Sequence, residues 1–140
     1  MADADATRIS RLGDNIRTAI AGEFFVAGEL SKRGWIATLT SKNTPGVDIL
    51  GNQDDRFIRI DVKTRTSGFR GGWQVGHVRI SDPGDFIVLV DLGREDEPPE
   101  YWIVPARRAQ KLLVTSGTRV LIRTRDVEEF YDAWELLDPR

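Results

Sequence analysis

The strongest structural signal in this chain of 140 residues lies in the alternating stretch Phe57-Ile58-Arg59-Ile60-Asp61-Val62-Lys63. Successive side chains of a β-strand point to opposite faces. The apolar side chains at 58, 60 and 62 would therefore share one face, and the charged side chains at 59, 61 and 63 the other. On the charged face a carboxylate stands beside an ammonium group, with Cα atoms roughly 7 Å apart. We predict a half-buried strand that carries an acid–lysine pair.

A second carboxylate precedes this strand. Asp48 lies in the short apolar run 47–50, with twelve residues between it and Asp61. The two runs flank the polar loop 51–55, which predicts a β-hairpin. Two carboxylates and a lysine on adjacent strands could hold a divalent metal and a water beside it, an arrangement suited to phosphodiester hydrolysis. An exposed strand face with a local salt bridge is the alternative for Asp61 and Lys63.

The composition limits the kinds of active site that the chain can contain. Hydrophobic residues make up 40% and charged residues 30% of the chain, as in a folded domain, and we expect one domain over residues 1–140. The absence of cysteine excludes disulfides, zinc–thiolate sites and cysteine nucleophiles. The single histidine, His77, excludes a multi-histidine metal site. Carboxylates remain as the ligand set, and their hard oxygens suit Mg²⁺ or Mn²⁺.

The distribution of charge points to an anionic partner. Net charge is −2, yet positions 56–79 contain six basic residues and one acidic residue. Such a patch attracts phosphates; the alternative is a solvated surface with its counter-charges elsewhere. Arg65 and Arg70 in this patch are candidate contacts to nucleic acid. Lys42 and Asn43 in the loop before Asp48 are further candidates, although a plain polar loop explains them equally well.

Nothing in the sequence indicates a membrane or export. No apolar run approaches the roughly 20 residues that span a bilayer. The stretch 1–6 lacks the basic and apolar regions of a signal peptide. We therefore expect no membrane partner and a cytoplasmic location.

The remaining elements follow from periodicity and turn residues. A helix is expected from about 14 to 33, with an apolar stripe formed by Ile16, Ile20, Phe24, Ala27 and Leu30. Further strands are expected at 35–39, 86–90, 101–104 and 120–122, with 86–90 buried on both faces, and residues 73–80 are ambiguous. A short helix is expected over 105–113, and a final helix to about 137, capped by Thr124 or Asp126. This order predicts a mixed α/β domain around a central sheet.

Glu23 is the unusual residue of the first helix. It lies three residues after Ile20 and four before Ala27, on the face of the apolar stripe. A carboxylate that faces a core costs several kcal/mol unless it is paired or bound. Glu23 is therefore a candidate member of the carboxylate cluster; a salt bridge to an arginine, or a place at the margin of the stripe, is the alternative.

These residues together resemble the PD-(D/E)XK nuclease superfamily, and in particular small members similar to archaeal Holliday junction resolvases. The resemblance covers about residues 22–64 and consists of the following segments: Gly22-Glu23, Gly34-Trp35, Pro45-Gly46-Val47-Asp48-Ile49-Leu50 and Ile60-Asp61-Val62-Lys63-Thr64. It implies an α+β, restriction endonuclease-like fold with a central mixed sheet flanked by helices. It also implies an endonuclease that cleaves DNA with Mg²⁺ or Mn²⁺.

The resemblance implies a role for each matching position. Asp48 and Asp61 would bind the metal, the Val62 carbonyl would complete the ligand shell, and Lys63 would orient the attacking water. Glu23 would join the cluster, often through water. Two positions depart from the usual pattern: the proline stands three residues before Asp48, and an aspartate occupies position 61, where glutamate or glutamine is more frequent. The shorter side chain keeps the charge that a ligand requires.

Two other interpretations remain open. The chain could be a catalytically inactive module of the same fold that binds nucleic acid or a protein partner, or the motif could be accidental in an unrelated α/β protein. If the substrate has two-fold symmetry, a homodimer would be favoured. The expected final helix or the region 86–90 could then supply the interface.

Overall fold

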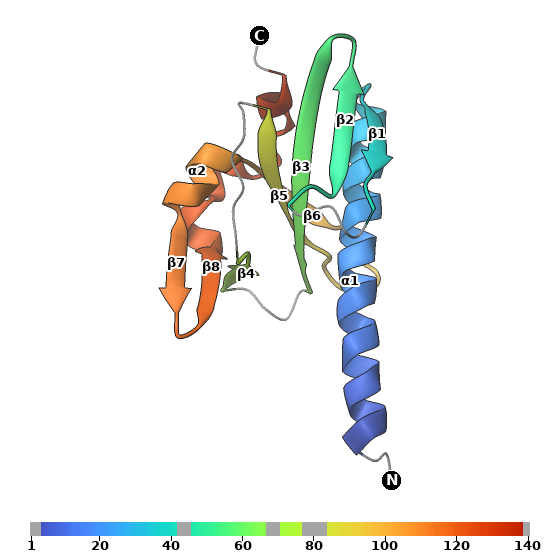
Figure 1. Ribbon diagram of the computed structural model, residues 1–140, viewed down its shortest axis with the longest axis vertical. Helices are drawn as coiled ribbons and strands as arrows, with labels where there is room; N and C mark the ends of the chain where they lie inside the picture. The colour runs from blue at the N-terminus through green and yellow to red at the C-terminus, as the bar shows by residue number, and fades with distance from the viewer. Residues whose placement is uncertain (1–3, 42–45, 67–70, 77–83, 139–140) are drawn as a thin grey trace.

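The structure is a computed structural model that describes residues 4–41, 46–66, 71–76 and 84–138, with side chains from residue 15 onward. Figure 1 shows a helix, a central sheet and a smaller second sheet. The elements are α1 (Ala4–Lys32), β1 (Ile36–Leu39), β2 (Ile49–Gln53), β3 (Arg56–Arg65), β4 (Gly72–Gln74), β5 (Asp85–Asp91), β6 (Glu100–Pro105), α2 (Ala106–Lys111), β7 (Leu113–Ser116) and β8 (Arg119–Arg123). Three 3₁₀ turns follow at Thr124–Asp126, Glu128–Phe130 and Trp134–Leu137.

The central sheet is mixed, with strand order β1-β2-β3-β5-β6. Its strands pair antiparallel except for β3 and β5, which run parallel. The smaller sheet has the order β4-β8-β7, and of its strands only β4 lies between the two parallel strands along the chain. A parallel pair needs a crossover connection, and here the segment that contains β4 provides it. The predicted hairpin is confirmed as β2 and β3, joined by a tight turn in which Gln53 pairs with Arg56.

Two hydrophobic clusters lie on opposite faces of the central sheet. One contains Val26 and Leu30 of α1 together with Ile58, Ile60 and Val62 of β3. The other joins Ile87, Leu89 and Trp102 to side chains of the second sheet and of the 3₁₀ turns. Strand β5 contributes to both clusters, which confirms that region 86–90 is buried on both faces. Figure 1 shows the same arrangement, with α1 on one side of the sheet and β4, β7 and β8 on the other.

A glycine lets α1 approach β3 closely. A Cβ atom at Gly22 would lie 1.8 Å from the hydroxyl oxygen of Thr64, too close for any side chain. The helix backbone therefore rests directly on the strand one residue after Lys63. This contact sets the position of α1 relative to the charged end of β3.

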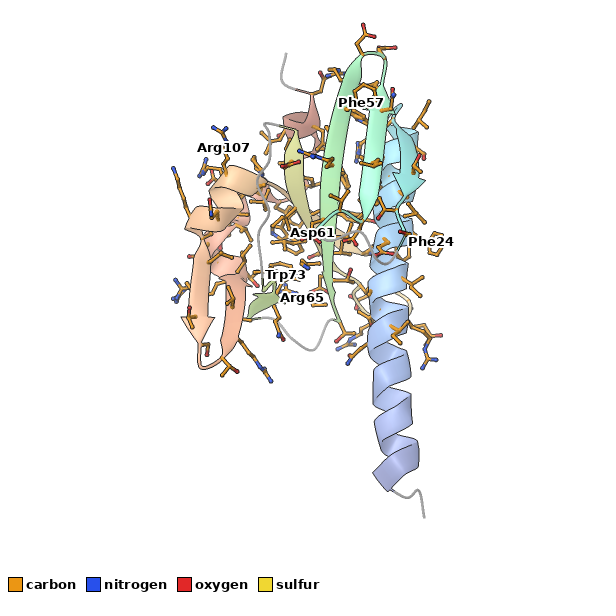
Figure 2. The ribbon with its side chains drawn as sticks, viewed as in Figure 1. Phe24, Phe57, Asp61, Arg65, Trp73 and Arg107 are labelled. Atoms are coloured by element: carbon orange, nitrogen blue, oxygen red, sulfur yellow. The ribbon has the colours of Figure 1, made fainter. Side chains whose placement is uncertain are left out.

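Several sequence expectations were wrong. The final segment forms short 3₁₀ turns instead of a helix, and an extended residue, Tyr131, interrupts them and bridges to Trp102. The short helix α2 ends at Lys111, before the expected end at 113, and strand β7 begins at Leu113. On α1, Phe24 is 61% exposed, because the helix faces the sheet with Gly22, Val26 and Leu30. Figure 2 shows the Phe24 side chain on the outer side of α1.

Neither of the two regions expected to supply a dimer interface offers an exposed helix or strand for it. No final helix forms, and the 86–90 region lies inside the sheet. Within the described part of the chain, no helix is long and apolar enough to cross a membrane.

Candidate active site

The hairpin brings Asp48 and Asp61 together. Ile49 pairs with Ile60 in the antiparallel ladder, and the Asp48 N–H donates to the Ile60 carbonyl at 2.8 Å. Asp48 lies just before β2, and its carboxyl group forms a side-chain hydrogen bond with the carboxyl group of Asp61, which projects from one face of β3. That face is the one turned away from α1, because the neighbouring Ile60 and Val62 pack against the helix. Figure 2 shows Asp61 in the middle of β3.

Backbone contacts hold Asp48 in place. Its carboxylate accepts a hydrogen bond from the Val62 N–H at 2.7 Å. Its carbonyl accepts one from the Thr40 N–H at 2.9 Å. The Thr40 hydroxyl donates to the carbonyl of Val47, the residue before Asp48. Thr40 had not been predicted as part of the site, and its place just before a polar loop was the only sequence signal for it.

The pKa of Asp61 is strongly perturbed in this position. Asp61 is buried, with 7% of its surface exposed. Burial raises the pKa of Asp61 to about 7; Lys63 opposes this shift, and the hydrogen bond and negative charge of Asp48 add to it. The Lys63 ammonium lies 3.4 Å from an Asp61 oxygen. Without a cation, the pair therefore retains a proton close to neutral pH.

The donor set fits a hard divalent cation. In an antiparallel ladder the N–H and C=O of one residue point to the same neighbour, so the Val62 carbonyl faces the side on which its N–H meets Asp48. Two carboxylates and this carbonyl are oxygen donors of the kind Mg²⁺ and Mn²⁺ prefer. A cation there would also replace the shared proton, which relieves the repulsion between Asp48 and Asp61.

Glu23 lies on a different element from Asp48 and Asp61. It is half-buried on α1, the helix that covers the opposite face of the sheet from Asp61. Among the described residues, no third acidic or histidine side chain joins Asp48 and Asp61 in a cluster that could hold a metal. The predicted role of Glu23 therefore remains a prediction that this arrangement does not support.

A partly buried ion pair lies next to Asp48 and Asp61. Arg59, two residues before Asp61 on the same face, donates from Nε to Asp85 at 2.7 Å. Asp85 is 8% exposed, and the parallel register places it beside Arg59. The charge pattern of β3 had indicated where Arg59 points, but nothing in the sequence indicated its partner on β5.

The basic residues predicted to contact nucleic acid have different positions. Arg65 is buried; its Nε donates to Asp91 at 2.9 Å, and its guanidinium lies 3.8 Å from the centre of the Trp73 ring. Figure 2 shows Arg65 and Trp73 next to each other in the interior. Because this guanidinium is committed to protein contacts, we leave Arg65 out of any nucleic-acid surface. Three other predicted residues lie outside the described residues: Lys42, Asn43 and Arg70.

Comparison with solved structures identifies the fold. The bacterial homing endonuclease I-Ssp6803I matches with a TM-score of 0.61 at 13% identity, over 98% of this chain and 92% of that one. The Holliday junction resolvase Hjc of the archaeon Archaeoglobus fulgidus matches with a TM-score of 0.49 at 15% identity, over 78% of this chain and 86% of that one.

By sequence the chain has no comparable match: neither family models nor curated proteins match it. The similarity in structure, together with the mixed sheet, confirms the predicted α+β, restriction endonuclease-like fold.

Proposed function

We propose that the protein is a metal-dependent endonuclease that hydrolyses phosphodiester bonds of DNA. One observation carries the proposal: the hairpin brings two carboxylates, Asp48 and Asp61, to one point, with Lys63 3.4 Å from Asp61. The restriction endonuclease-like fold supports it. A cytoplasmic location and a homodimer acting on a two-fold symmetric substrate are further parts of this proposal.

Each residue of the site would have a distinct part in the reaction. Asp48, Asp61 and the Val62 carbonyl would hold Mg²⁺ or Mn²⁺, which lowers the pKa of a water and stabilises the charge of the transition state. The Lys63 ammonium lies 3.4 Å from an Asp61 oxygen, beside the position where a metal-bound water would stand. A protonated lysine can orient the water and stabilise charge that develops on the phosphate. This makes orientation a better role for Lys63 than proton abstraction.

Cleavage assays on branched, single-stranded and duplex DNA, with and without Mn²⁺, test the proposal. Asp61→Asn and Lys63→Met should each reduce metal-dependent cleavage by about two orders of magnitude or more, because each removes a group used in the transition state. Asp55→Asn in the exposed hairpin turn and Lys111→Met on α2 are matched controls that should keep activity. Undiminished cleavage by both site variants would refute the assignment.

One observation favours a second candidate, an inactive module of the same fold that binds nucleic acid or a protein partner. Within the described ranges, only two acidic side chains meet at the site. Calorimetry with Mn²⁺ separates the candidates: no binding at millimolar concentration, together with no cleavage, would favour the module.

A further inference from the structure

A pocket of about 300 Å³ with a mixed polar and apolar lining lies beyond Lys63, at the end of β3. Its walls come from α1, β3, β4 and β8. In Figure 1 the lower end of β3 lies between α1 and β4, which is where these walls meet. The pocket therefore continues directly from the strand that carries Asp61 and Lys63.

The chemical character of this pocket is cationic. Its described lining contains two arginines and no carboxylate, although the chain as a whole is acidic. Arg65 is neutralised by Asp91. Arg119 is exposed and forms no ion pair with any described residue. One uncompensated positive charge thus faces the pocket.

Neutral donors surround that charge. Three neutral side chains line the pocket and make no side-chain hydrogen bond within the described part of the chain: Asn15 of α1, Thr66 directly after β3, and Gln74 of β4. A cation with amide and hydroxyl donors suits an anion that accepts several hydrogen bonds. A phosphodiester group has this property, whereas a metal ion or an amine does not.

The pocket lies a few nucleotides' length along β3 from Asp61. Thr66 follows Asp61 by five residues along an extended strand, or about 16 Å. One strand of duplex DNA advances about 3.4 Å per nucleotide. A backbone that passes Asp61 and follows β3 would therefore reach the pocket within about five nucleotides.

We propose that this pocket binds a backbone phosphate of the substrate strand a few nucleotides from the bond that is cleaved, with Arg119 as the main contact. The proposal rests on the proposed nuclease function. Such a contact would fix the register of the strand at the active site without reading its sequence. The pocket would then determine how tightly the substrate binds, while Asp48 and Asp61 would serve the hydrolysis of the phosphodiester bond.

Binding of a fluorescent 30-nucleotide DNA, measured by anisotropy in EDTA, tests this inference. Arg119→Gln should weaken binding about threefold to tenfold and reduce the slope of log affinity against log salt by about one. Thr66→Val and Gln74→Ala should weaken binding less. Arg107→Gln removes the same charge from α2, where Figure 2 shows the side chain pointing away from the body of the protein, and should bind like the wild type. Thermal melts would check that each variant folds.

The outcomes separate the two proposals. Equal affinity of the Arg119 and Arg107 variants, in a protein that cleaves DNA, overturns the pocket and leaves the nuclease intact. Selective weakening by Arg119→Gln, in a protein that never cleaves, supports the pocket and overturns the nuclease. If millimolar inorganic phosphate competes away the Arg119-dependent part of binding, the pocket recognises phosphate alone. Failure of the wild type to bind DNA overturns the inference.

Discussion

The carboxyl groups of Asp48 and Asp61 meet across the β2–β3 ladder, and different partners hold them: Val62 N–H at 2.7 Å from Asp48, and Lys63 at 3.4 Å from Asp61. Two carboxylates in contact repel each other. Burial of Asp61 prevents water from screening that repulsion. The hairpin therefore maintains an arrangement that is unfavourable without a proton or a cation.

The first prediction concerns stability against pH in metal-free protein. The pKa of Asp61 is raised from 3.8 to about 7 on folding, so between these values the folded state binds more protons. The contribution of Asp61 to the free energy of unfolding is therefore fully present below pH 4. It falls by about 2–4 kcal/mol as the pH rises to 7. Asp61→Asn imitates the protonated acid and should be more stable than the wild type at pH 8, with little difference at pH 4.

Urea unfolding in EDTA across this pH range measures the effect. Asp55→Asn, in the exposed turn, should retain the wild-type pH dependence. If the Asp61→Asn protein shows the same dependence as the wild type, Asp61 does not hold the proton.

The second prediction concerns the metal. Mn²⁺ should raise the melting temperature of the wild type, and at 100 times its Kd it should stabilise the fold by about 2.7 kcal/mol. Because a proton competes for the same carboxyl pair, apparent affinity should fall up to about tenfold per pH unit below 7. Asp48→Asn and Asp61→Asn should abolish the shift. An undiminished shift in both variants would mean that the cation binds elsewhere.

The third prediction concerns the contact between α1 and β3. Gly22→Ala should destabilise the protein by about 1–3 kcal/mol or more, because the added methyl group would overlap the Thr64 side chain. Gly28 on the same helix has no atom within 4 Å of its Cβ position. Gly28→Ala should therefore be neutral or stabilising by up to about 1 kcal/mol. Equal stability of the two variants would show that α1 does not rest on Thr64.

The fourth prediction concerns Arg65. Arg65→Met should cost about 3–5 kcal/mol in denaturant unfolding, because it leaves Asp91 charged and poorly solvated. Arg65→Met combined with Asp91→Asn should recover part of this loss. Arg107→Met, on the surface of α2, should change stability by less than about 0.5 kcal/mol. A stable Arg65→Met protein with weakened DNA binding would instead favour the surface role predicted from the sequence.

Much of the central sheet could be predicted because its signals are local. Alternation identified β3, two flanking apolar runs identified the hairpin, and a continuous apolar run identified β5 as buried on both faces. The proximity of Asp48 and Asp61 followed from the hairpin, since an antiparallel pair with a short turn has few possible registers.

Features that depend on distant residues could not be predicted. Sequence placed Arg65 in a basic patch, but β3 and β5 run parallel and bring it beside Asp91. Periodicity placed Phe24 on the apolar stripe, but Gly22 set which side of α1 meets the sheet. The C-terminal segment has helical periodicity, yet its pairing with Trp102 breaks it into 3₁₀ turns.

The sequence by itself determined the strands, the hairpin, the order of the acidic and basic motif residues and the oxygen-only ligand chemistry, because each depends on neighbouring residues or on composition. Only the tertiary structure decided which charges meet, which are buried and which stay free. It placed Glu23 on the helix across the sheet, paired Arg65 with Asp91 and left Arg119 facing a pocket. Charge interactions depend on distance and burial, and both are set by strands that are far apart in the chain.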